Sequence, residues 1–104
     1  MIVRVWRGET LAEKADEYLD VLRRTGVADY RNTEGNKGVR ILRRIADGRA
    51  EFVILTTWDS FDSIRRFAGV PVDAARYYEE DKKYLLGFEP TVSHYEVVLD
   101  SDDD

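Results

Sequence analysis

The sequence predicts an α+β domain with the ferredoxin-like order β-α-β-β-α-β and a four-stranded antiparallel sheet with helices on one side. Three observations lead to this prediction. Residues 51–69 pass from an apolar β run to a helical spacing of apolar residues. Residues 46–49 read Ala-Asp-Gly-Arg between two β-rich runs, which is typical of a hairpin. β-rich segments also open and close the chain.

The composition indicates one globular domain, which we place at residues 1–99. Of 104 residues, 43% are hydrophobic, and the absence of cysteine excludes a disulfide framework and a thiolate nucleophile. The net charge of −5 and the lack of a membrane-length apolar run argue against nucleic acid and membrane partners. We expect a cytoplasmic protein whose acidic residues 100–104 form a disordered tail.

The first crossover is predicted as a strand, a helix and a loop. Met1–Trp6 is β-rich, and Thr10–Glu13 matches a capping box in which Thr10 caps the amide of Glu13. Apolar residues recur at helical spacing as far as Leu22, and Gly26 is expected to end this helix. Residues 27–37 are rich in turn formers and predict a loop, which is either functional or a plain surface crossover.

The hairpin is predicted to join Gly38–Ile45 to Ala50–Trp58 through the two-residue loop Asp47-Gly48. Three facing pairs follow from this register: Arg44 with Glu51, Ile41 with Ile54 on one face, and Leu42 with Val53 on the other. Both faces of the sheet are then apolar, and each needs a cover. Helices cover one face, so we infer that a second copy of the chain covers the other and gives a homodimer.

The second crossover begins with a helix at residues 61–68, between the capping residue Ser60 and the stop signal Gly69. Its apolar positions at helical spacing are Phe61, Ile64, Phe67 and Ala68. A short helical segment at residues 72–78 and a further turn within residues 79–86 are expected next. A last strand at residues 91–99 completes the predicted sheet.

Two residues are candidates for chemistry, and each has a structural alternative. Trp58 ends a buried strand and is either a core aromatic or the wall of a pocket. His94 is the only histidine and is either a base near neutral pH or a hydrogen-bonded residue of a half-buried strand. One histidine without a second ligand at suitable spacing predicts no metal site.

Tyrosines and one arginine are candidates for contacts with a ligand. Tyr77, Tyr78 and Tyr84 either complete the core or orient a ligand at a cavity mouth. Arg43 shares the face of Ile41 and therefore either pairs with a carboxylate, for which Glu96 is the candidate, or is turned outward by a bulge.

An ordered set of motifs in this chain resembles the antibiotic biosynthesis monooxygenase family. Besides the N-terminal strand, they are Leu55-Thr56-Thr57-Trp58-Asp59-Ser60, Phe67-Ala68-Gly69, Asp73-Ala74-Ala75-Arg76-Tyr77-Tyr78 and Val92-Ser93-His94-Tyr95-Glu96-Val97. The resemblance spans nearly the whole chain apart from the acidic tail. It implies a dimeric α+β barrel, in which two ferredoxin-like sheets face each other, with a small hydrophobic cavity between each sheet and its helices.

The resemblance also implies which reactions to consider, since the family includes cofactor-free oxygenases of polycyclic quinols and haem-degrading enzymes. Quinone-forming members carry an asparagine, a tyrosine and an arginine where an ungapped count places Ile54, Ile64 and Tyr78. Haem-degrading members carry an asparagine on the first strand and a histidine after the second helix, where this chain offers Trp6 and Arg76.

The leading interpretation is a cofactor-independent monooxygenase-like enzyme for a small aromatic or polyketide-type substrate, with no metal or cofactor. Its candidate catalytic residues are His94 and Tyr78, either of which would handle the substrate's proton. Its candidate substrate-binding residues are Trp58, Trp6, Arg43, Ile54, Ile64, Phe67 and Tyr77. Two alternatives stay open: a non-catalytic homodimeric module, stress-related or regulatory, that binds a hydrophobic small molecule, and a haem-degrading monooxygenase.

Overall fold

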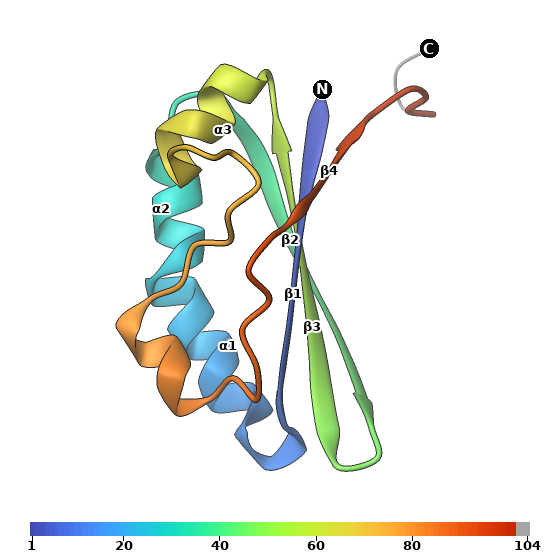
Figure 1. Ribbon diagram of the computed structural model, residues 1–104. Helices are drawn as coiled ribbons and strands as arrows, with labels where there is room; N and C mark the ends of the chain where they lie inside the picture. The colour runs from blue at the N-terminus through green and yellow to red at the C-terminus, as the bar shows by residue number, and fades with distance from the viewer. Residues whose placement is uncertain (102–104) are drawn as a thin grey trace.

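The computed structural model describes residues 1–101, which form a four-stranded antiparallel sheet with helices on one face (Figure 1). The elements are β1 (Ile2–Leu11), α1 (Ala15–Arg24), α2 (Gly26–Asn32), β2 (Asn36–Ala46), β3 (Arg49–Trp58), α3 (Phe61–Ala68) and β4 (Ser93–Glu96), with 3-10 helices at Ala12–Lys14 and Glu79–Lys83. The strand order β2-β3-β1-β4 confirms the predicted ferredoxin-like fold. The last three residues of the predicted tail lie outside the described residues.

The hairpin of β2 and β3 has the register that the sequence predicted. The facing pairs Arg44–Glu51, Ile41–Ile54 and Leu42–Val53 are all present. Asp47 and Gly48 have φ values of 54° and 76°, the left-handed conformation that a two-residue hairpin turn requires. Local turn chemistry thus fixes which side chains of these strands face the helices.

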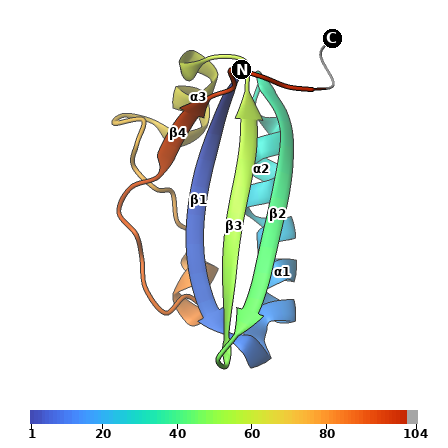
Figure 2. The same ribbon diagram turned by 90° about the vertical axis from the view of Figure 1, so that its right-hand side faces the viewer.

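The two faces of the sheet differ in how they are covered (Figure 2). On β3, alternate residues from Ala50 to Trp58 are buried beneath the helices. The opposite face, which we call the bare face, has no helix over it within residues 1–101, and its side chains include the apolar residues Val3, Leu42, Val53, Leu55 and Tyr95. Apolar side chains on both faces agree with the prediction made from the sequence.

The start of the first crossover corrects the predicted capping box. Thr10 lies inside β1 opposite Ala50, and its hydroxyl donates to the carbonyl of Leu11 at 2.9 Å instead of capping a helix. β1 pairs with β3 over ten positions as far as Leu11, so ladder hydrogen bonds outweigh the local capping signal. The α-helix therefore begins at Ala15, after one 3-10 turn.

The predicted loop at residues 27–37 is also wrong, because α2 occupies most of it. Gly26 begins this helix instead of ending the previous one, and the break falls at Thr25. Val27 and Tyr30 are 9% and 7% exposed, so one helical turn places two apolar side chains against the core. Burial of this face outweighs the turn-forming composition.

The second crossover is partly as predicted. Ser60 caps α3 by accepting from the amide of Ser63 at 3.2 Å, and Gly69 ends the helix with φ 81°. Phe61, predicted on the buried face, is 41% exposed, whereas Ile64 and Phe67 are buried. The predicted helix at residues 72–78 is absent, since this segment is extended and pairs Ala74 with Thr91. β4 is shorter than predicted and spans Ser93–Glu96. No helix within residues 1–101 is long and apolar enough to cross a membrane.

Candidate functional site

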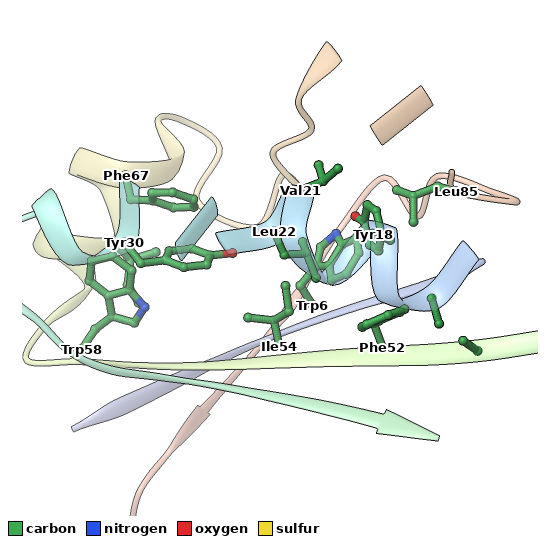
Figure 3. Close-up of a cluster of buried hydrophobic side chains, with 13 residues drawn as sticks. Trp6, Tyr18, Val21, Leu22, Tyr30, Phe52, Ile54, Trp58, Phe67 and Leu85 are labelled. Carbon is green, nitrogen blue, oxygen red and sulfur yellow. The ribbon is translucent and has the colours of Figure 1, made fainter. Parts of the chain in front are cut away.

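A small, partly open cavity lies between the sheet and the helices and has a volume of about 20 Å³. This is room for about one water molecule. Figure 3 shows the aromatic side chains that fill the layer around it. The lining residues are Trp6, Tyr18, Leu22, Gly26, Tyr30, Ile54, Arg76, Tyr78 and Asp81. They come from β1, α1, α2, β3 and the segment of residues 69–92, which we call the covering segment.

Three aromatic rings in edge and tilted contact close one end of the layer. The Tyr30 and Phe67 ring centroids are 4.5 Å apart, and the Trp58 centroid lies 6.4 Å from Tyr30 and 5.9 Å from Phe67. Trp58 is fully buried, and its indole Nε1 donates to Thr56 Oγ1 at 2.8 Å. Trp58 is therefore a core residue whose indole N–H has a hydrogen-bond partner. Tyr30 lies between Trp58 and the cavity.

The Tyr30 hydroxyl has no hydrogen-bond partner among the described residues, although the side chain lines the cavity. Burial raises the pKa of Tyr30 to about 12, while the positive charges of Arg4 and Arg76 oppose that rise. The indole N–H of Trp6, another lining residue, is buried without a partner as well. Of the groups around the cavity, the Trp6 indole N–H is thus buried and unsatisfied among the described residues.

Arg76 and Tyr78 converge on one carboxylate, that of Asp29 on α2. Arg76 Nη2 lies 3.2 Å from Asp29 Oδ2, and the Tyr78 hydroxyl donates to the same oxygen at 2.5 Å. The Arg76 guanidinium also stacks over the rings of Phe67 and Tyr78. Burial, followed by the hydrogen bond to Asp29, raises the pKa of Tyr78, so its hydroxyl stays protonated at neutral pH.

Asp81 is a carboxylate among the residues that line the cavity, and it is buried, with 3% of the residue exposed. Its Oδ1 accepts from the Tyr18 hydroxyl at 3.0 Å, and its Oδ2 accepts from the backbone N–H of Tyr78 at 2.7 Å. Burial raises the pKa of Asp81 above that of an ordinary aspartate. We call Tyr18, Tyr78 and Asp81 the Asp81 cluster.

A second cluster, the Arg4 cluster, consists of the buried Arg4, the partly buried His94 and the exposed Asp73. Arg4 donates to the carbonyls of Val72 and Ala74 at 2.8 and 2.9 Å. It also donates to His94 Nε2 at 3.1 Å, since a guanidinium cannot accept, and His94 Nδ1 then donates to Asp73 Oδ1 at 3.0 Å. Burial and the Arg4 charge lower the pKa of His94, so the imidazole is neutral at pH 7 and both nitrogens are engaged.

The structure brings together only part of the residue set singled out from the sequence. Trp6, Ile54 and Tyr78 line the cavity, whereas His94 belongs to the Arg4 cluster. The other members of the set lie in the core or at its edge: Trp58 and Phe67 behind Tyr30, Ile64 fully buried, and Tyr77 against Trp6 and Phe88.

Arg43 and Tyr84 lie away from the cavity. Arg43 does face the helices and does pair with a carboxylate, but its partner is Asp16 of α1 at 2.7 Å and not Glu96. Glu96 lies opposite Ile2 on β4, which is the edge strand at the other end of the sheet from β2, the strand of Arg43. Tyr84 packs beside Tyr18 and donates to Glu17 at 3.3 Å.

Sequence reasoning missed several lining residues for identifiable reasons. Tyr30 was missed because residues 27–37 were expected to form a loop, and Gly26 was missed because it was expected to end a helix. Asp81 was not among the candidates singled out from the sequence, and within residues 1–101 no group of three or more possible ligands could hold a metal ion. Arg4 shares a strand face with Ile2 and Trp6, and that placement could have identified it as a buried cation.

Comparison with known proteins shows the fold. No protein-family model and no curated protein matches the sequence. Among solved structures, the haem degrader MhuD from Mycobacterium tuberculosis, with two haems in its active site, is 21% identical over 96% of this chain and 98% of its own, with a TM-score of 0.63. A point mutant of MhuD with two manganese protoporphyrins per active site gives 20% identity, 96% and 97% coverage and a TM-score of 0.61.

A second kind of neighbour is a proposed antibiotic biosynthesis monooxygenase from Bacillus cereus. It is 15% identical over 90% of this chain and 87% of its own, with a TM-score of 0.57. At such identities the likeness establishes a shared fold and not a shared reaction. The resemblance noted from the sequence is therefore confirmed for the fold over nearly the whole chain.

The residues around the cavity do not fit haem. The histidine of the chain, His94, has both nitrogens engaged and does not line the cavity. The lining hydroxyls of Tyr18, Tyr30 and Tyr78 have raised pKa values, so none supplies a phenolate ligand at neutral pH.

Proposed function

We propose that this chain is a cofactor-independent, monooxygenase-like enzyme that oxidises a small phenolic or polyketide-type aromatic compound between its sheet and helices. The observation that supports it is the cavity lining, in which four aromatic side chains surround one arginine and one carboxylate. Apolar walls with a few convergent polar groups are typical of small-molecule sites. The fold shared with a proposed monooxygenase and with MhuD adds to this support.

The chemistry needs no bound cofactor if the substrate itself is the reductant. Loss of the phenolic proton leaves an electron-rich anion, and this anion reduces dioxygen directly. One oxygen atom replaces two hydrogens of a ring methylene group as a carbonyl, and the other oxygen leaves as water. The protein's part is to bind the aromatic ring, to accept the proton and to exclude bulk water.

Substrate binding requires the covering segment to move, because the present cavity holds about one water molecule. This segment supplies Arg76, Tyr78 and Asp81, and apart from the 3-10 helix Glu79–Lys83 it has little regular structure. It lies along the helices and returns to β4 (Figure 1). Segments of this kind open at lower free-energy cost than strands or helices.

The two proton carriers expected from the sequence receive different roles in this proposal. Tyr78 lines the cavity, and its hydroxyl donates its one hydrogen to Asp29 but keeps an acceptor lone pair, so we assign it the orientation of the substrate hydroxyl as an acceptor. His94 is engaged at both nitrogens, and we assign it the support of Arg4, which holds the carbonyls of Val72 and Ala74. Neither residue accepts the proton in this arrangement.

We also propose that the enzyme is a cytoplasmic homodimer that pairs through the bare face. Apolar side chains on that face, including Leu42 at 44% and Tyr95 at 59% exposure, are left without a cover in one chain. Native mass spectrometry tests this part. A mass twice that of the chain supports the pairing, and a monomer at micromolar concentration refutes it.

A non-catalytic module that binds a hydrophobic small molecule is the second candidate, and the tightly filled cavity favours it. Oxygen uptake separates the two functions. Protein treated with a chelator and free of haem is assayed with hydroxylated naphthalenes and anthrones. Turnover that falls in Tyr78→Phe but not in the control Tyr84→Phe, whose side chain does not line the cavity, supports the enzyme. Binding of these compounds without any uptake supports the module.

A further inference from the structure

Asp81 is a buried carboxylate that no cation neutralises. Within residues 1–101 it forms no ion pair, and its partners are one tyrosine hydroxyl and one backbone N–H. Capping the 3-10 helix does not require an acid, because asparagine or serine caps a helix end equally well. A buried, unpaired carboxylate has a desolvation cost that a capping role alone does not explain.

We propose that the Asp81 carboxylate accepts the phenolic proton of a substrate bound in the cavity, and that Tyr18 is the positioning residue that orients this carboxylate. The inference rests on the proposed function and names the base that the function needs. Among the described residues that line the cavity, Asp81 is the only carboxylate. The other ionisable lining groups are the tyrosines at 18, 30 and 78 and the guanidinium of Arg76.

The proton transfer is chemically simple. The phenolic O–H bond breaks, its electron pair stays on the phenol oxygen, and the proton moves to a carboxylate oxygen of Asp81. Nothing is oxidised or reduced in this step. Each carboxylate oxygen has two lone pairs, and Oδ1 and Oδ2 each accept one hydrogen bond, so each retains one lone pair.

Two features of the site act to narrow the difference between the pKa of Asp81 and the pKa of a bound phenol. Burial raises the pKa of Asp81, which makes it a stronger base than an exposed aspartate. Burial raises the pKa of a hydroxyl in this cavity, and the charges of Arg4 and Arg76 oppose that rise, as at Tyr30. A substrate phenol beside the unpartnered Tyr30 hydroxyl would experience the same two positive charges and could accept a hydrogen bond from it.

The groups that face Asp81 from neighbouring elements favour this assignment. Tyr18 from α1 donates to it, and Tyr30 from α2 stays protonated at neutral pH. Glu80, next in the chain, is turned to Arg24 and raises the pKa of Asp81 further by its charge. Within residues 1–101, no positive charge lies close enough to Asp81 to lower its pKa.

The test uses 4-nitrophenol, whose phenolate absorbs visible light, with the full-length protein under argon. At a pH below the probe's own pKa, we expect wild type to bind the probe as phenolate. Asp81→Asn should bind it as the neutral phenol, with the bound phenolate fraction lower by about tenfold or more. Glu79→Gln, an exposed neutral control on the same 3-10 helix, should match wild type.

Tyr18→Phe keeps the test decisive if Asp81→Asn does not fold. Because the Tyr18 hydrogen bond stabilises the ionised carboxylate, its removal makes Asp81 a stronger base and should raise the bound phenolate fraction. The proposal is overturned if wild type binds no probe, if it binds only the neutral form, or if Tyr18→Phe leaves the fraction unchanged. A phenolate signal that persists in folded Asp81→Asn overturns it as well.

Oxygen uptake, measured separately, distinguishes failure of this inference from failure of the proposed function. A bound phenolate that depends on Asp81, without uptake of oxygen by any phenol tested, supports the proton transfer and refutes the oxygenase. Oxygen uptake that is equal in wild type and Asp81→Asn supports the oxygenase and overturns the role of Asp81.

Discussion

The covering segment contacts two polar clusters, the Arg4 cluster and the Asp81 cluster, and they differ in what their hydrogen bonds leave free. In the Arg4 cluster, Arg4 holds two carbonyls of the segment, both nitrogens of His94 are engaged, and none of its three residues lines the cavity. In the Asp81 cluster, the carboxylate keeps spare acceptor capacity and lines the cavity. Burial of polar groups therefore does not mark a site by itself, whereas unused hydrogen-bonding capacity beside a cavity does.

The largest expected effect on stability comes from removing the centre of the Arg4 cluster. Arg4→Met leaves two carbonyls and His94 Nε2 without their donor, so we expect the free energy of unfolding to fall by about 3 kcal/mol. Urea denaturation measures this change. The exposed control Arg31→Met on α2 should stay within about 0.5 kcal/mol of wild type. Equal effects of the two substitutions would contradict the role given to the Arg4 cluster.

The next expected effect is on catalysis and separates the two clusters by function. With any phenol that wild type turns over, Asp81→Asn should lower kcat by about 100-fold, because it removes the proton acceptor. His94→Gln should lower kcat far less, since His94 does not line the cavity. Steady-state oxygen uptake measures both variants. A larger loss in His94→Gln than in Asp81→Asn would reverse the assignment.

The pH dependence of stability should have opposite signs for the two clusters. Burial, and then the Arg4 charge, lowers the pKa of His94, so its contribution to stability is present above about pH 6.5 and is lost as the pH falls through the folded-state pKa. Burial raises the pKa of Asp81, so stability is lost instead as the pH rises through its folded-state value. Urea titrations of wild type, His94→Gln and Asp81→Asn, repeated over the pH range that includes both folded-state pKa values, measure how the contribution of each residue to stability changes with pH. Changes of equal sign for the two residues would contradict this account.

The smallest expected effect concerns the mouth of the cavity. Tyr78→Phe removes one hydrogen bond to Asp29, which keeps Arg76 as a partner, so the loss of stability should be about 0.5–1.5 kcal/mol. Thermal unfolding, with Tyr84→Phe as the matched control, measures it. A loss as large as that of Arg4→Met would mean that Tyr78 is mainly structural.

How much the sequence predicted depends on whether local or distant contacts decide each element. The hairpin and its register follow from the turn residues Asp47-Gly48 and from the alternation of side chains between the two faces of each strand. Both act within a few residues. The capping signal at Thr10 and the loop composition around Tyr30 are also local, but long-range strand pairing and burial override them. Fold class was therefore predictable, and individual element boundaries were less so.

The candidate site was less predictable for the same physical reason. Tyr18, Tyr30 and Asp81 lie 12 residues or more apart in the sequence, and no local pattern links them. Only the folded chain brings the Tyr18 hydroxyl to Asp81 and the covering segment over β1. Tyr78 could be singled out from its motif, whereas the engagement of His94 by Arg4 depends on the pairing of β1 with β4.

The central claim is that a small phenol bound beneath the covering segment reduces dioxygen without a cofactor. The most direct measurement follows heavy-isotope-labelled dioxygen into the product of a hydroxylated anthrone, with haem-free, chelator-treated protein. The account predicts one labelled oxygen atom in the product and one in water, with labelled product forming about 100-fold more slowly in Asp81→Asn and at the wild-type rate in Glu79→Gln. Product oxygen that comes from solvent, or turnover that requires added haem or metal, would contradict the account.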